Sequence, residues 1–343
     1  VSSATVGGTL TLASAGSISQ TGAISADELD ATANGGDMAL KNASNAISNA
    51  SLTASGAVTF YDGTDLNVTG GSAGGDFTVL DTGSISFLSS IQLGSGALLA
   101  VAGWDGTTTA PASLTDTGAY GNHGGSITVG GAGASGNVAI GSASGTTTLA
   151  GETIKVDADN GYAQIGYHGA GTGAISVITS GDLIMTAGDG TGDYAQIGDG
   201  GYKVGGSTDD NINVAVAGDL TMNGSDGQEA YVQIGNGGAE SNSNTHGYDE
   251  NGDASVSAHS IVLNAGSGDA SYAQIGDGGY KAGEGLDGTT SIGGNITVAS
   301  DSAVHLLGGG TDAYAQIGNG GDLINNNVAD GSSGEIVGDI SVN

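Results

Sequence analysis

Residues 162–166 read Tyr162-Ala-Gln-Ile-Gly166, and this pentapeptide decides the fold because it returns along the second half of the chain. It recurs at Tyr194, Tyr272 and Tyr314, with a Tyr-Val-Gln-Ile-Gly variant at Tyr231. Successive tyrosines are 32, 37, 41 and 42 residues apart, the range in which one supersecondary unit stacks on the next. The repeat therefore predicts a solenoid.

Two further apolar doublets with a spacing of two residues accompany each pentapeptide. One series comprises Ile175/Val177, Ile212/Val214, Val256, Ile296/Val298 and Ile340/Val342. The other comprises Ile154/Val156, Leu183/Met185, Leu220/Met222, Ile261/Leu263 and Val304/Leu306. Three short strands per unit predict an all-β chain, a right-handed parallel β-helix of roughly a dozen coils. Insertions rich in Gly, Asn and Asp follow the pentapeptide at one corner.

The strand that contains the pentapeptide has one purely apolar face. Ala195 and Ile197 share it with their equivalents in the other units, so we expect this face to form the core. The tyrosines and glutamines alternate with them and are expected to point outward, as exposed ladders about 4.8 Å apart. Such ladders could be structural stacks or a ligand-binding platform. Their members are Tyr162, Gln164, Tyr194, Gln196, Tyr231, Gln233, Tyr272, Gln274, Tyr314 and Gln316.

Composition and charge exclude several classes of partner. The chain has 69 glycines in 343 residues, no cysteine, and a net charge of −32 from 36 acidic residues against four lysines. Binding a phosphate backbone requires clustered cations, so we expect no nucleic-acid partner and no anionic membrane surface. The absence of cysteine excludes disulfides. No apolar run reaches the length of a membrane span, so we expect no membrane insertion.

The first half of the chain lacks the pentapeptide but keeps the pattern of short strands and turns. Gly36-Asp37 and Gly75-Asp76 lie 39 residues apart, which corresponds to two coils. No linker interrupts the pattern, so residues 1–150 and 151–343 are expected to form two continuous sections of one helix. The least regular stretch, from Gly103 to Gly125 and including Trp104, predicts a longer loop or a shoulder on the shaft.

The first half also carries Ala15-Gly-Ser-Ile-Ser-Gln-Thr-Gly-Ala-Ile-Ser-Ala26 and, after it, Gly35-Gly-Asp-Met-Ala-Leu-Lys-Asn-Ala-Ser-Asn-Ala-Ile47. Over roughly residues 8 to 100 the chain resembles filamentous-haemagglutinin-like adhesins, the large exoproteins of bacterial two-partner secretion. The Tyr-Ala-Gln-Ile-Gly half resembles repeats of very large bacterial surface and biofilm-matrix adhesins. The resemblance implies a right-handed parallel β-helix, an outer-membrane secretion partner, a secreted or cell-surface location and a role in adhesion. It supplies no catalytic residues.

The chain begins at Val1 without a signal peptide, so we expect an interior section of a longer shaft. Its acidic turns offer the hard oxygen ligands that calcium prefers, and calcium is the one cofactor we consider. The candidate ligands are Asp189, Asp193, Asp249 and Asp253. Further acidic turns contain Asp199, Asp209, Asp210 and Asp277. No histidine has metal-ligand spacing, so we expect no zinc site at His123, His168, His246, His259 or His305.

These observations favour a non-enzymatic shaft section of a secreted bacterial adhesin, acting in attachment or biofilm matrix cohesion. Its partners would be a polysaccharide or cell-surface glycan, or other copies of itself. A passive structural spacer or filament subunit is the alternative. A polysaccharide lyase or hydrolase is a further possibility, because parallel β-helices also host these enzymes. A hydrolase would need two carboxylates on adjacent strands about 5–10 Å apart, and no such pair is visible in the sequence.

Overall fold

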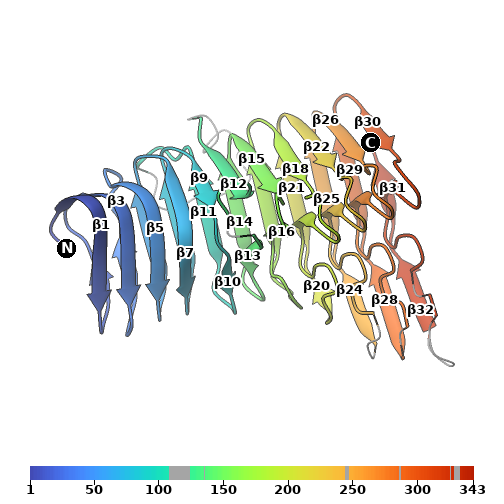
Figure 1. Ribbon diagram of the computed structural model, residues 1–343, viewed down its shortest axis with the longest axis horizontal. Helices are drawn as coiled ribbons and strands as arrows, with labels where there is room; N and C mark the ends of the chain where they lie inside the picture. Colours follow the sequence, from blue (N-terminus) through green and yellow to red (C-terminus); the bar gives the residue numbers. More distant parts are fainter. Residues whose placement is uncertain (108–123, 135, 244–246, 286, 325, 328–332) are drawn as a thin grey trace.

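The computed structural model describes residues 1–107, 124–134, 136–243, 247–285, 287–324, 326–327 and 333–343. These residues form an elongated stack of β-coils, with the N-terminus at one end and the C-terminus at the other (Figure 1). The strands belong to four sheets whose neighbouring members are parallel. This arrangement confirms the predicted all-β parallel β-helix. Most of the predicted loop between Gly103 and Gly125, including Pro111 and His123, lies outside the described residues, as does His246.

The first two sheets run the length of the stack, with eleven strands each. The first sheet comprises β1 (Ala4–Ser14), β3 (Ile24–Ala33), β5 (Ala46–Ala54), β7 (Leu66–Ala73), β9 (Ile85–Phe87), β12 (Ser126–Gly130), β15 (Thr153–Asp157), β18 (Leu183–Thr186), β22 (Asp219–Asn223), β26 (Ser260–Asn264) and β30 (Val304–Leu307). The second comprises β2 (Ile18–Ser19), β4 (Met38–Leu40), β6 (Val58–Asp62), β8 (Phe77–Asp81), β11 (Leu98–Ala102), β14 (Thr147–Gly151), β17 (Ile175–Thr179), β21 (Ile212–Val216), β25 (Ala254–Ala258), β29 (Ile296–Ser300) and β33 (Ile340–Val342).

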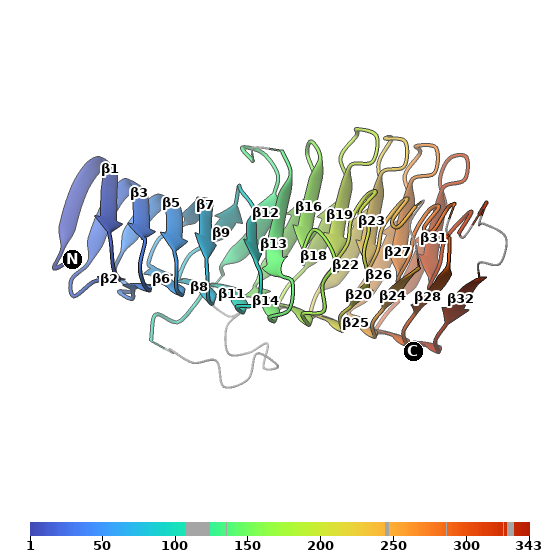
Figure 2. The ribbon, with the colours of Figure 1, turned by 90° about the horizontal axis from the view of Figure 1, so that it is seen from below.

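The other two sheets begin part-way along the stack. The third sheet has seven strands, β10 (Ile91–Leu93), β13 (Val138–Ser142), β16 (Tyr162–Ile165), β19 (Tyr194–Ile197), β23 (Tyr231–Ile234), β27 (Tyr272–Ile275) and β31 (Tyr314–Ile317). The fourth has four strands within the insertions, β20 (Thr208–Asp209), β24 (Tyr248–Asn251), β28 (Thr289–Gly293) and β32 (Ser333–Val337). The later coils are accordingly broader than the first ones (Figure 2).

The register agrees with the predicted repeat. Met38 pairs with Val58, and Val58 pairs with Phe77, so the 39 residues between the two Gly-Asp turns do span two coils. The three predicted strands per unit are present in the pentapeptide half. In the coils before β10, by contrast, the described residues form strands of the first and second sheets only. The insertions, which the sequence predicted only as a variable corner, contribute the fourth sheet.

One hydrophobic core runs inside the coils. It extends from Ile18 to Val298, and the predicted inward residues Ala195 and Ile197 are completely buried within it. Each buried aliphatic side chain contributes about 1.5–3 kcal/mol relative to exposure. Trp104 lies in a smaller cluster, where its ring is 4.9 Å from that of Tyr61. The described part of the chain contains no helix of the length and apolarity that crossing a bilayer would require.

Candidate functional site

The five pentapeptide strands of the third sheet stack in exact register. Tyr162, Tyr194, Tyr231, Tyr272 and Tyr314 pair one above the other along the axis. Consecutive ring centroids are 5.0, 4.7, 4.8 and 5.0 Å apart, and the planes differ by 15°, 3°, 1° and 1°. This spacing is the distance between neighbouring strands, so the backbone register itself sets the stacking of the rings.

The predicted exposure of this ladder is wrong. Tyr194, Tyr231 and Tyr272 expose at most 1 % of their surface. Four of the five glutamines, Gln164, Gln196, Gln233 and Gln274, are completely buried, and Gln316 is half-buried. Only the two end rings, Tyr162 and Tyr314, are half-buried rather than enclosed. Alternation within a strand correctly separated the two faces, but it carries no information about what covers the outer one.

The insertions cover the outer face, and glycines allow them to approach it. A Cβ on Gly201 would lie 2.4 Å from the hydroxyl of Tyr194, and one on Gly238 would lie 2.4 Å from that of Tyr231. Both glycines also have positive φ, 132° and 142°. Only glycine fits this close contact, because a side chain at either position would collide with the tyrosine hydroxyl. The Gly-Gly pair that follows each pentapeptide except the first was thus the signal in the sequence for a covered face.

Each buried glutamine joins its own coil to the next one. Nε2 of Gln233 donates to the carbonyl oxygens of Gly276 and Gly278, both at 3.0 Å. Its Oε1 accepts the hydroxyl of Tyr272 at 3.1 Å. Gln164, Gln196 and Gln274 repeat this pattern. The tyrosines and glutamines therefore form a second, polar core whose hydrogen bonds are satisfied within the stack.

A second column of side chains stands beside the glutamines. Asp199, Asn236, Asp277 and Asn319 occupy equivalent positions, and a side-chain oxygen of each accepts a backbone N–H of the preceding coil at 2.6–3.0 Å. In the asparagines, Nδ2 donates to two carbonyl groups as well. For Asn236 these belong to Asp210 and Asn251, at 3.1 and 3.0 Å. Asn319 makes the equivalent pair with Gly294 and Val337.

Asp277 has a carboxyl oxygen where the asparagines have an amide. Its Oδ2 is buried without a hydrogen-bond partner. In the register of the coils, Gly252 is equivalent to Asp210 and Gly294, and Gly293 is equivalent to Asn251 and Val337. The carbonyls of Gly252 and Gly293 are thus the counterparts, next to Asp277, of those that the two asparagines bond. An ionised carboxylate would be repelled by such carbonyls, whereas a protonated one can donate to them. Burial, with smaller contributions from the charges of Glu250 and Asp210, raises the pKa of Asp277 well above its usual value.

Other buried carboxyl groups follow the same rule. Burial, with the charge of Asp210 beside it, raises the pKa of Asp199. Burial also raises the pKa of Glu250 to about 7 and that of Asp62, in the first half, to about 7. Each of these side chains is completely buried. The groups consequently behave as parts of the interior, and a polysaccharide in solvent does not reach them.

The four candidate calcium ligands are not brought together. Asp193 accepts the N–H of Gly190 at 2.8 Å within its own turn, and Asp253 accepts the N–H of Asn295 in the next coil at 2.8 Å. Asp189 and Asp249 are exposed. Across the described ranges, no three His, Cys, Asp or Glu side chains are grouped so that they could hold a metal ion. Calcium binding stays a prediction.

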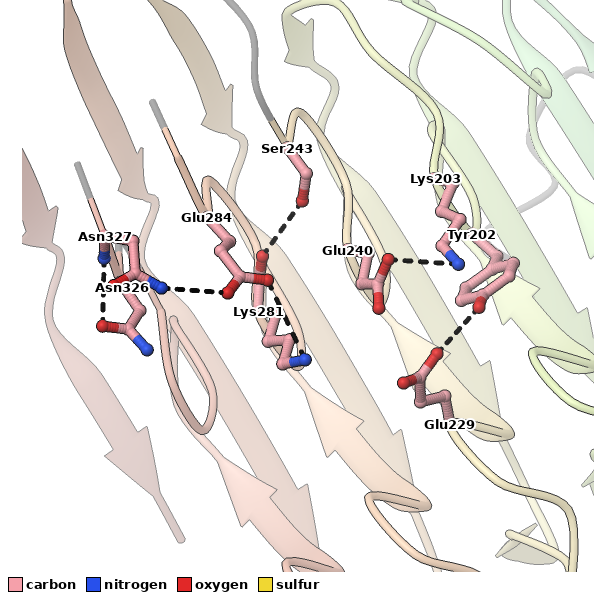
Figure 3. A network of polar contacts seen from close by, with 9 residues as sticks. All are labelled: Tyr202, Lys203, Glu229, Glu240, Ser243, Lys281, Glu284, Asn326 and Asn327. Atoms are coloured by element: carbon pink, nitrogen blue, oxygen red, sulfur yellow. Dashed lines mark hydrogen bonds and ion pairs between the residues drawn. The ribbon is translucent and has the colours of Figure 1, made fainter. Parts of the chain in front are cut away.

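Charged side chains of neighbouring insertions meet at the outer corner of the stack (Figure 3). Nζ of Lys203 lies 3.2 Å from Oε2 of Glu240 and 4.6 Å from the ring centre of Tyr202. The hydroxyl of Tyr202 donates to Oε2 of Glu229 in the next coil at 2.7 Å. Exposed ion pairs of this kind stabilise a fold little, typically by about 0–1 kcal/mol. The Tyr202 ring itself is contacted by Glu229 at its hydroxyl and by Lys203 over its face.

A pocket of about 280 Å³ opens between Tyr202 and the first ring of the tyrosine stack. Its aromatic lining is Tyr162, His168, Tyr194 and Tyr202, and its polar lining includes Asn137, Thr191 and Asp193. Burial lowers the pKa of His168, which favours the neutral imidazole. Partly exposed rings beside an amide, a hydroxyl and a carboxylate suit a small polar ligand with an apolar face. Of the predicted ladder, Tyr162 at one end lines this pocket, and Tyr314 at the other end lines a second pocket of about 400 Å³ with Asp312, Gln316 and Asp322.

No protein-family model, curated protein or solved structure matches this chain. The resemblance to secreted adhesins stays an expectation from the sequence.

Replacing Gln233 with Leu should lower the free energy of unfolding by about 2–4 kcal/mol, because the carbonyls of Gly276 and Gly278 and the Tyr272 hydroxyl lose a buried partner. Urea titration followed by circular dichroism measures the loss. Gln228→Leu is the matched control, since the Gln228 side chain is exposed. Equal stability of the two variants would contradict a buried glutamine column.

Acid should stabilise the protein. A carboxyl group whose pKa is raised in the fold contributes stability that is complete below its unfolded pKa, near 4, and is lost as the pH rises through the folded pKa. The raised pKa values of Asp62, Asp81, Asp199, Glu250 and Asp277 all act in this direction. We expect a higher melting temperature at pH 5 than at pH 8, measured by differential scanning calorimetry.

Asp277→Asn isolates one of these groups. The amide can donate where the carboxylate cannot, so the variant should raise the melting temperature at pH 8 and change it little at pH 5. Asp301→Asn makes the same substitution at an exposed position and serves as the control. An increase at pH 8 no larger than that of Asp301→Asn would show that Asp277 is not held as a neutral acid.

Proposed function

We propose that this chain is a non-enzymatic shaft section of a secreted bacterial adhesin, which acts in attachment or in cohesion of a biofilm matrix. The observation that carries the proposal is the continuity of the stack. Two sheets of eleven parallel strands each enclose one hydrophobic core that extends from Ile18 to Val298. Such a solenoid grows in one dimension, so its natural product is a long, stiff surface.

The polar core strengthens the same proposal. Hydrogen bonds from Gln196, Gln233 and Gln274 cross from one coil to the next, in addition to the backbone ladders. A shaft that carries tension benefits from bonds directed along its axis. Asp199, Glu250 and Asp277 expose at most 1 % of their surface, so these carboxyl groups are not available to a lyase or hydrolase mechanism.

The adhesin and secretion parts of the proposal are supported by the sequence resemblance over roughly residues 8 to 100. The charge of −32 is compatible with an extracellular surface that remains soluble and repels anionic polymers. The surface charge therefore favours neutral glycans over anionic ones, and association between copies of the chain is the other part of the proposal. Export through a dedicated outer-membrane partner belongs to the proposal for the full-length protein.

Binding to a polysaccharide panel tests this function. The full chain is immobilised and probed with neutral glucans, galactans and mannans and with uronans, with and without calcium, while sedimentation velocity monitors self-association. We expect binding to a glycan or association between copies, without release of reducing ends or unsaturated uronates. Release of such products would make the chain an enzyme. The absence of both binding and association would make it a passive spacer.

A further inference from the structure

The tyrosine stack has a defined beginning within the chain. Val138 of β13 pairs with Ala163 of β16, so Asn137 occupies the position that precedes Tyr162 in the column. Every later step of the column places a tyrosine on a tyrosine. Asn137 is exposed and has no aromatic ring to offer. Tyr162 is therefore a terminal ring whose neighbour on one side is a small amide.

The contacts of Tyr162 show which of its faces is covered. The rings of Tyr194 and His168 both stack on it, with centroids 5.0 and 4.5 Å away. Nδ1 of His168 also lies 3.0 Å from the hydroxyl of Tyr194. If the rings of Tyr194 and His168 lay on opposite faces of Tyr162, the distance between them would be roughly the sum of the two stacking distances. That is too far for this hydrogen bond. They share one face, and neither of them covers the face directed toward Asn137.

The surroundings of this open face are suited to a sugar. The pocket of about 280 Å³ extends along Tyr162 from Asn137 in the preceding coil to Thr191, Asp193 and Tyr202 in the following coil. His168 and Tyr194, which stack on the other face of Tyr162, also line it. Its volume is near the lower end of the range of small-molecule pockets, about 300–1,000 Å³, and thus suits one monosaccharide unit. The apolar face of a pyranose can stack on the aromatic ring, while its hydroxyl groups bond the amide, hydroxyl and carboxylate beside it.

Charge selects among sugars. Asp193 contributes a carboxylate to the pocket, and the nearby Lys203 is already paired with Glu240. A uronate or sialate would therefore meet like charge without a free cation to bind it. We propose that the open face of Tyr162 is a stacking platform for one neutral pyranose unit of a glycan. This site rests on the proposed adhesive function and gives it a location at the start of the tyrosine stack.

Titration of the full chain with neutral gluco-, galacto- and manno-oligosaccharides tests the site, with oligogalacturonate as the charged comparison and NMR shift changes as the readout. We expect at least one neutral oligosaccharide to bind, and oligogalacturonate to bind more weakly. Tyr162→Ser should weaken binding about tenfold or more, which corresponds to about 1.4 kcal/mol. Tyr162→Phe keeps the ring and should bind within about threefold of the wild-type chain.

Asn137→Tyr provides a variant that does not remove any part of the stack. The new ring would cover the open face, so glycan binding should be lost while the melting temperature is maintained or raised. Unchanged binding in Asn137→Tyr and Tyr162→Ser would overturn the site, as would stronger binding of oligogalacturonate or no binding of any neutral sugar. Glycan binding or self-association that persists in both variants would leave the adhesive function standing without this site.

Discussion

The structure depends on parallel, in-register pairing between successive coils. Because each coil bonds only to its neighbours along the axis, every side chain lies about 4.8 Å from its equivalent in the next coil, and like residues meet like. For Ile197, Ile234 and Ile275 this places aliphatic groups in one continuous core. For Tyr194, Tyr231 and Tyr272 it places rings face to face. A shift of one residue in any coil would exchange the two faces.

The same register explains how this chain buries so many polar groups. An isolated buried amide is unfavourable, but each buried glutamine of the column donates to two glycine carbonyls of the next coil, as Gln233 does to those of Gly276 and Gly278. Asp199 and Asp277 accept a backbone N–H through Oδ1 and leave Oδ2 buried without a partner, and burial raises the pKa of both. Asp199 and Asp277 alternate with Asn236 and Asn319 in one column, so the chain uses two chemically different side chains for one structural role.

The sequence predicted the parts of the fold that follow from periodicity. Alternation identified the inward Ala and Ile of each pentapeptide, and the spacing of the Gly-Asp turns identified the coil length. It did not predict that Tyr231 and Gln233 are buried, because the covering layer comes from insertions without a regular period. The candidate pocket was also hidden. The first pentapeptide differs from the others by Tyr167-His168 in place of the Gly-Gly turn. That Asn137 precedes Tyr162 in the column is visible only once the register of β13 and β16 is known.

Exchange of the glutamine side-chain amides with deuterium, followed by NMR, tests the central claim most directly. In a register-locked stack with a polar second core, the Nε2 protons of Gln196, Gln233 and Gln274 should exchange as slowly as the backbone amides of β19, β23 and β27. Exchange at the rate of an exposed amide, such as that of Gln228, would contradict the account, because these glutamines would then face solvent and the insertions would not cover the column.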